Sequence, residues 1–174
     1  MTLPTAITPS PRVDLPHHRI HEGRYFAVTT TATGLPVGIP KDYMIISPPI
    51  TISIAHVIII VTSFPGVKFE LFEGAIVSNN GIPLPSFNQD RANPAAATGF
   101  AFEDPTIVST GTLIFSQIIG SATEGGTGGN SNRDEEEFLF IPLTNYILRI
   151  TPSANGTLLS VQMRAYRQAT QQGT

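Results

Sequence analysis

The chain contains no cysteine and no tryptophan, and few of its residues are charged. Without cysteine it can form neither a disulfide framework nor a thiolate metal site. Only 13% of the 174 residues are charged, against about 25% in an average domain. The ten basic residues are scattered and the net charge is −3. A phosphate-binding surface needs clustered Lys and Arg, so we expect no nucleic-acid partner.

Long apolar runs are missing as well. The longest, Val57 to Val61, is far shorter than the roughly 20 residues of a membrane-spanning helix. Prolines interrupt the N-terminus, which therefore lacks the basic-then-apolar pattern of a signal peptide. We expect a soluble protein that is assembled in the cytoplasm and has no membrane partner.

Turn-forming and β-forming residues dominate what is present. Fifteen glycines and fifteen prolines separate β-branched and aromatic stretches, and no stretch has a convincing helical period. About eight to ten strands are expected, among them 25–31, 43–47, 50–60, the strand from Lys68, 106–119, 138–141, 146–151 and 159–166. The sequence predicts an all-β fold, an antiparallel jelly-roll-like β-sandwich. An up-and-down barrel is the second choice, because the loops at 81–105 and 120–135 are long.

Two tight turns predict hairpins. Phe64-Pro65-Gly66 leads into the Lys68 strand, and Asn155-Gly156 precedes the final strand. In that last strand one set of alternating residues is expected to face inward (Leu159, Val161, Met163, Ala165) and the other outward (Ser160, Gln162, Arg164, Tyr166).

Three segments are expected along the chain: an extended arm at 1–22, the sandwich at 23–167 and a polar tail at 168–174. Four prolines in the first sixteen residues favour polyproline-II or irregular geometry for the arm. Such an arm is either disordered or laid along the surface of a partner.

The candidate chemistry points away from catalysis. His17, His18, His21 and Glu22 resemble a metal-ligand cluster, but a proline-rich arm offers no preorganised cavity for one. His56 is expected to face solvent or a neighbouring subunit.

The run Asp134 to Glu137 is expected to be a solvated start to a strand, with a weak Ca²⁺ site as the alternative. The glycine-rich loop before it has neither the lysine nor the following helix of a phosphate-binding loop. We therefore expect no enzyme, no cofactor and no small-molecule substrate.

The order of short motifs resembles the jelly-roll decoration, or cement, proteins on the capsids of tailed bacteriophages. The resemblance spans about residues 17–166, and its order and spacing carry more weight than any single motif. One departure is the absence of Trp, whose usual places Phe138 and Tyr166 are expected to fill. The matching pieces are His21–Phe26, Leu71–Gly74, Val77–Gly81, Asn88–Arg91, Gly111–Leu113, the glycine-rich loop ending at Arg133, and Asn145–Ile150.

The resemblance implies a structural virion protein on the outer capsid surface, stabilising contacts between major capsid protein subunits. It also implies a homo-oligomer, a dimer or a trimer. Residues 1–26 would be the main capsid-contacting arm, with the 81–105 and 120–135 loops touching capsid or sister copies. The candidate contact residues are His17, His18, Arg19, His21, Glu22, Arg24, Asn88 and Arg91. One alternative is a carbohydrate- or receptor-binding sandwich of a phage tail or adhesin, and another is a cupin-like metalloenzyme.

Overall fold

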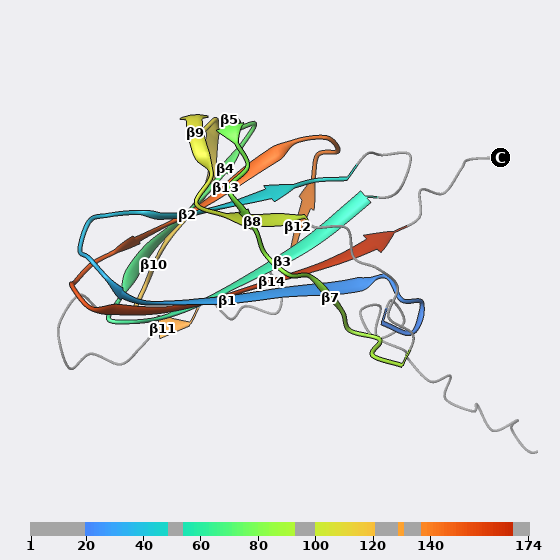
Figure 1. Ribbon diagram of the computed structural model, residues 1–174, viewed down its shortest axis with the longest axis horizontal. Coiled ribbons are helices and arrows are strands. Elements are labelled where there is room, and N and C mark those ends of the chain that lie inside the picture. The colour runs from blue at the N-terminus through green and yellow to red at the C-terminus, as the bar shows by residue number, and fades with distance from the viewer. Residues whose placement is uncertain (1–19, 49–53, 93–99, 121–128, 131–136, 169–174) are drawn as a thin grey trace, which may run out of the picture.

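Two antiparallel β-sheets pack face to face, and a small third sheet lies on the outside of one of them (Figure 1). The computed structural model describes residues 20–48, 54–92, 100–120, 129–130 and 137–168. Fourteen strands and no helical element make up this part of the chain, and every strand pairing in it is antiparallel. The predicted all-β antiparallel sandwich is confirmed. The jelly-roll connectivity stays a prediction. Of the predicted arm at 1–22, residues 1–19 lie outside the described residues.

The first sheet has six strands in the order β11–β3–β14–β1–β7, with β12 also paired to β3. The long strands β1, β3 and β14 alternate as the sequence predicts, so that Val28, Val61 and Met163 are completely buried. The strands of this sheet are β1 (Tyr25–Leu35), β3 (Ile54–Phe64), β7 (Phe87–Asn88), β11 (Gly129–Asn130), β12 (Glu137–Phe140) and β14 (Thr157–Gln168).

The second sheet has the order β10–β4–β13–β2–β8–β6. Phe69 and Leu71 of β4 point into the core while Lys68 is exposed, as their alternation predicts. The strands of this sheet are β2 (Lys41–Ile46), β4 (Val67–Glu73), β6 (Ile82–Pro83), β8 (Ala101–Glu103), β10 (Thr112–Ile119) and β13 (Asn145–Pro152).

A chain of aromatic rings closes one side of the sandwich, where β10 of the second sheet and β12 of the first sheet approach each other. Phe115 of β10 contacts Phe138 of β12 edge to face, with ring centroids 5.7 Å apart. The chain continues from Phe138 to Phe140, which stacks on Tyr146 at 3.7 Å. Tilted and edge-to-face ring contacts of this kind stabilise a core beyond simple area burial.

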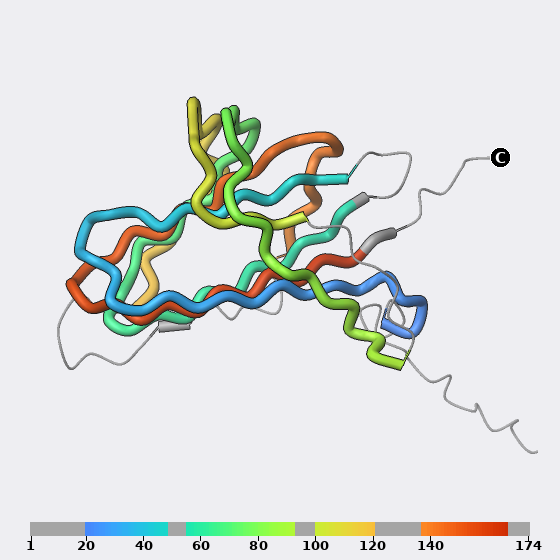
Figure 2. The backbone as a smooth tube through the Cα atoms, viewed as in Figure 1, coloured from blue at the N-terminus to red at the C-terminus, as the bar shows by residue number. Residues whose placement is uncertain are grey.

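The third sheet consists of β5 (Ile76–Asn79) and β9 (Thr106–Ser109), and we call this pair the arch. Segments 67–83 and 101–119 run antiparallel to each other, pairing first as β4 with β10, then as β5 with β9, then as β6 with β8. Since β4–β10 and β8–β6 lie at opposite edges of the second sheet, the arch crosses its outer face. Figures 1 and 2 show the parts of these segments around β5 and β9 rising together from the sandwich.

Both predicted hairpins are wrong in the same way. The turn at Phe64-Pro65-Gly66 joins β3 of the first sheet to β4 of the second, and the turn at Asn155-Gly156 joins β13 of the second sheet to β14 of the first. Turn residues specify that the chain reverses. They do not specify whether the next strand pairs edge to edge or packs face to face, and here burial of both apolar faces in one core decides for the second arrangement.

Two other segments differ from the prediction. Part of the expected loop at 81–105 is strand β8, which hydrogen-bonds to β2. The expected strand at 106–119 is broken at Gly111 (φ +82°) into β9 and β10, which belong to different sheets. Only glycine fits at this break, because the Cβ of any other residue at position 111 would overlap the carbonyl oxygen of Glu73.

Candidate interaction surfaces

The structure brings two of the predicted contact segments together at the start of β1. Strand β7 pairs with β1, so that Asn88 lies opposite Phe26. The backbone N–H of Gln89 donates to the carbonyl oxygen of Tyr25 at 2.9 Å. We call the surface formed by residues 21–24 and 87–91 the arm root, because residues 1–19 join the described chain there. The predicted candidates His17, His18 and Arg19 lie outside the described residues.

Asn88 is the organising side chain of the arm root. Only 2% of the residue is exposed. Its Nδ2 donates to the carbonyl oxygen of Gly23 at 2.9 Å, and its Oδ1 accepts from the backbone N–H of Asp90 at 2.9 Å. Asn88 therefore positions neighbouring residues and offers little surface of its own to a partner.

The exposed members of the arm root surround this amide. His21, Glu22, Arg24 and Arg91 are all exposed. The guanidinium of Arg91 lies 5.9 Å from the centre of the Phe87 ring, a cation–π distance, and 54% of Phe87 is exposed. The part of the chain that the structure describes contains no group of three or more potential metal ligands. The arm root thus presents both charge signs and one aromatic ring.

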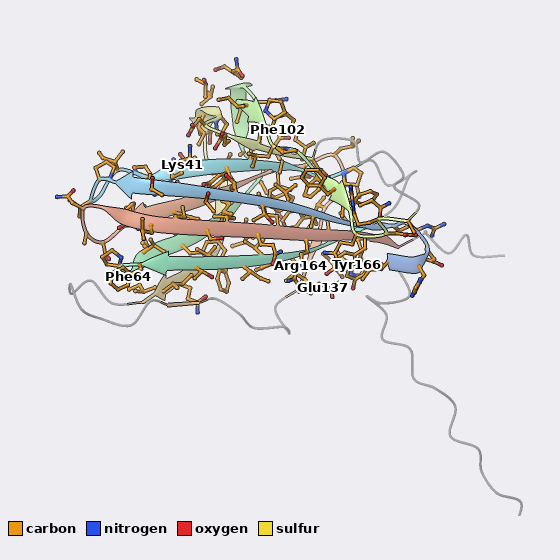
Figure 3. The ribbon with its side chains drawn as sticks, turned by 60° about the horizontal axis from the view of Figure 1, so that its bottom comes forward. Lys41, Phe64, Phe102, Glu137, Arg164 and Tyr166 are labelled. Atoms are coloured by element: carbon orange, nitrogen blue, oxygen red, sulfur yellow. The ribbon has the colours of Figure 1, made fainter. Side chains whose placement is uncertain are left out.

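A second polar cluster lies on the outer face of the first sheet, and sequence reasoning missed it. His56, Tyr166 and Tyr25 occupy one row across β3, β14 and β1. The rings of His56 and Tyr166 stack at 4.4 Å, and those of Tyr166 and Tyr25 at 5.9 Å. Glu137 Oε1 accepts from the Tyr166 hydroxyl at 2.5 Å and contacts Nδ1 of His56 (Figure 3 labels Glu137 and Tyr166).

This cluster bears on three predictions. His56 was expected to face solvent or a neighbouring subunit; it lies on the outer face of the sheet, but only 12% of its side chain is exposed. Tyr166 projects outward as predicted, yet it is covered, with 3% exposed. Glu137 is the exposed first residue of β12, as predicted for a solvated start to a strand, and it also has two side-chain partners. Residues 134–136 lie outside the described residues. Burial raises the pKa of the Tyr25 hydroxyl, against a lowering influence of Arg164. The cluster is a fixed, hydrogen-bonded patch of the sheet.

The arch has a buried underside and an exposed upper side. Val77 of β5 and Ile107 of β9 pack on a small second core, which includes the completely buried Met44 and Ile147 on the outer face of the second sheet. Ile76 and Val108 occupy the alternate positions and are 59% and 67% exposed. The arch therefore holds two aliphatic side chains outward on a supported ribbon.

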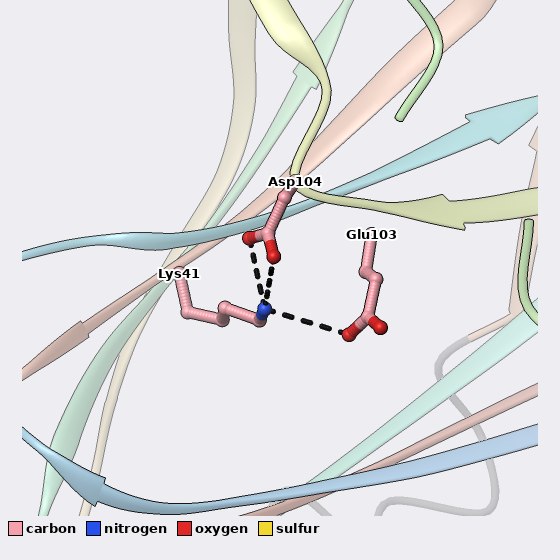
Figure 4. A network of polar contacts seen from close by, with 3 residues as sticks. All are labelled: Lys41, Glu103 and Asp104. Carbon is pink, nitrogen blue, oxygen red and sulfur yellow. Dashed lines mark hydrogen bonds and ion pairs between the residues drawn. The ribbon is translucent and has the colours of Figure 1, made fainter. Parts of the chain in front are cut away.

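Ion pairs fix the base of the arch. Lys41 Nζ donates to both carboxylate oxygens of Asp104, at 2.8 and 2.7 Å, and lies 3.4 Å from Glu103 (Figure 4). Burial would lower the pKa of Lys41, but hydrogen bonds and the charges of Asp104 and Glu103 outweigh it and raise that pKa. Asp104 has a positive φ of 54°, which a short polar side chain tolerates better than most residues.

A bidentate pair beside it joins two strands under the arch. Arg149 of β13 donates from Nε and Nη2 to the two carboxylate oxygens of Asp42 on β2, each at 2.8 Å. Its guanidinium lies 5.9 Å from the centre of the Phe72 ring. Planar two-point pairing of this kind has more geometric specificity than a single contact.

The two stretches of chain that contain β5 and β9 carry no ionisable side chain. Residues 74–89 and 105–123 contain no Asp, Glu, Lys, Arg or His. The scarcity of charged residues in the chain is therefore greatest in these two stretches. Segregated composition of this kind could have indicated a contact surface from sequence alone, since partner-facing surfaces are depleted in charge.

Comparison with protein-family models, curated proteins and solved structures found no match. Within the described residues, no helix is long and apolar enough to cross a membrane.

Proposed function

We propose that this protein is a structural virion protein that binds the outer surface of an icosahedral capsid and stabilises contacts between major capsid protein subunits. The motif order that resembles phage decoration proteins supports the capsid as the partner. The jelly-roll connectivity of those proteins is part of the same proposal.

The arch is the observation that carries this proposal. A two-stranded ribbon is marginally stable in water by itself, yet here a dedicated second core supports one. The side that this support leaves outward carries exposed Ile76 and Val108 within an uncharged stretch. Exposed apolar residues that group together favour association with another protein over solvation. We assign the arch to direct capsid contact.

The arm root supplies the second contact. Arm residues that become ordered on a partner add interface area at an entropic cost. Two weak contacts on one rigid body reinforce each other, and a symmetric shell repeats them many times. The proposed role therefore needs no single strong binding site.

Co-sedimentation with capsids tests the arch. Ile76→Lys and Val108→Lys place a charge at positions that are more than half exposed, so both variants should fold. Each should reduce co-sedimentation at least about tenfold, because a lysine buried against a partner must be desolvated. Leu158→Lys is the matched control, since Leu158 is 49% exposed and lies on β14 of the first sheet, whereas the arch lies over the second sheet. Equal binding by all three variants would rule out the arch as the contact.

Deletion of residues 1–20 tests the arm. The remaining chain should fold, because both sheets and their core begin after this segment. It should no longer sediment with capsids. Undiminished co-sedimentation of the shortened chain would show that the arm is not the main contact.

A further inference from the structure

The edge of the second sheet formed by β10 differs from the other sheet edges. Strand β10 ends the strand order and, among the described strands, hydrogen-bonds only to β4. It is eight residues long, whereas the other edge strands β6, β7 and β11 have two residues each and β12 has four. A long free edge exposes a row of backbone donors and acceptors that can pair with another strand.

The side chains of β10 do nothing to discourage such pairing. Natural proteins protect edges with charges, prolines or very short strands. The edge strand β6 contains Pro83 and β12 begins with Glu137, but β10 contains neither a charge nor a proline. Its aliphatic residues Leu113, Ile114 and Ile118 are 48%, 41% and 79% exposed.

The geometry of β10 leaves part of the edge regular. A register shift between Leu113 and Phe115 bends the beginning of the strand. From Phe115 to Ile119 the pairing with β4 continues without interruption. Phe115 and Ile119 belong to or pack against the core, so this half of the strand is anchored from inside. Five residues therefore form a straight, anchored, uncharged edge.

We propose that Phe115–Ile119 pairs with the same segment of a second copy, antiparallel across a twofold axis. The second sheets of two copies, six strands each, would then continue into one another. A twofold contact brings each surface patch against itself, so it requires a patch that does not repel itself. The nearest charges on β4, Lys68 and Glu70, neutralise each other at 2.6 Å. The uncharged side chains of β10 beside this neutralised pair do not repel an identical strand. Recognition of a different protein usually depends on complementary charges, which β10 lacks.

This contact and the proposed capsid contact use different surfaces. The arch lies over β13 and β2, and β10 lies at the sheet edge. Self-association through β10 does not depend on the capsid role, so each can fail while the other stands. If both hold, the dimer doubles the number of arches and arms per bound particle, which increases avidity on a repeating shell.

Sedimentation of the full-length protein in the micromolar range tests the proposal. The unmodified chain should be a dimer. Ile118→Lys should weaken association at least about 100-fold, because two like charges would lie diagonally across the axis on the same face of the joined sheet. Leu143→Lys, at a comparably exposed position outside β10, should remain a dimer. A monomeric unmodified chain, or an Ile118→Lys dimer as stable as the original, would overturn the proposal.

Disulfide trapping locates the contact independently. The chain has no native cysteine, so a single-cysteine variant can form a disulfide only between copies. Antiparallel pairing of 115–119 about a twofold axis places residue 116 of one copy opposite residue 118 of the other. Directly paired residues lie within the roughly 7 Å between Cα atoms that bridging requires. Mild oxidation of an equimolar mixture of Ser116→Cys and Ile118→Cys chains should therefore trap a mixed dimer, whereas a mixture of Ser116→Cys and Leu143→Cys chains should not. Equal trapping in the two mixtures would overturn the β10 assignment. If the unmodified chain and Ile118→Lys were both monomers and only the variant lost capsid binding, the β10 edge would instead be assigned to the capsid contact.

Discussion

At the scale of single residues, the arm root depends on a side chain that a partner would scarcely touch. Asn88 satisfies the carbonyl group of Gly23 and the N–H group of Asp90 from a buried position. The sequence drew attention to Asn88 as a contact candidate. It could not show that this amide faces inward, because its burial depends on the pairing of β7 with the start of β1, and Asn88 lies 65 residues after Gly23 in the chain.

Asn88→Ala should destabilise the protein by about 1–3 kcal/mol, because it leaves two backbone groups without their partner in a buried site. Urea unfolding followed by circular dichroism measures this change. Asn80→Ala is the control: Asn80 is exposed in the turn after β5, and its substitution should change stability by no more than about 0.5 kcal/mol. Equal effects of the two substitutions would show that the Asn88 hydrogen bonds contribute nothing.

Tyrosine ionisation should limit stability at alkaline pH. Burial, assisted by the neighbouring Glu73 carboxylate, raises the pKa of Tyr146 from its ordinary 10.0 to about 12, although the Ile141 N–H opposes this. Burial raises the pKa of Tyr43 in the same direction. Below about pH 10 the Tyr146 hydroxyl is protonated in both the folded and the unfolded chain, so its contribution to the stability of the fold is fully present. As the pH rises from about 10 to about 12, the unfolded chain loses its proton first and the folded state loses stability.

Urea unfolding at a series of pH values tests this expectation. The unfolding free energy should fall across that window, and Tyr146→Phe should make the fall shallower because one ionising group has been removed. The same slope with and without Tyr146 would contradict the assignment.

At the scale of elements, the sequence predicted strands better than it predicted their partners. The alternation in Lys68–Leu71 and in Leu159–Ala165 gave the correct buried faces, because period two follows from strand geometry alone. The two turns were placed correctly but assigned to hairpins. The choice between a neighbouring strand and the opposite sheet depends on contacts throughout the core, which no local pattern contains.

The candidate sites divide in the same way. The arm-root residues could be named from sequence motifs, since both segments carry exposed polar side chains. The cluster of His56, Glu137 and Tyr166 could not, because three separate strands meet there. The arch was partly visible as an uncharged stretch, but its support by a second core requires the strand order.

Two glycines should control the arch. Gly81 (φ +90°) and Gly111 (φ +82°) lie at its two ends, and a side chain at either would overlap backbone atoms of the opposite segment. Gly111→Ala should destabilise the protein by about 3 kcal/mol or more, through both strain and overlap. Gly34→Ala is the matched control, because Gly34 also has a positive φ (+69°) but has no atom within 4 Å of the added carbon.

Gly34→Ala should lower the free energy of unfolding by only about 1–2 kcal/mol, the cost of placing a side chain at a positive φ. Thermal or urea unfolding of the two variants gives the comparison. A Gly111→Ala protein no less stable than Gly34→Ala would show that the segments at the base of the arch are not closely packed.

At the scale of the whole molecule, we propose separate roles for three surfaces. The arch and the arm root lie in different regions, on the outer face of the second sheet and at the β7 edge of the first sheet (Figure 1). The β10 edge lies on the opposite side of the sheet order from β6 and β8. In the proposed account they give a weakly charged sandwich one edge for self-association and two surfaces for binding a repeating shell.

Imaging of intact virus particles that carry this protein tests the proposed capsid role. The sandwich should give density at regular symmetry-related positions outside the shell, with the arch directed at the capsid. Particles lacking the protein should show the same shell without that density. Density confined to the tail, or none on the particle, would contradict the account.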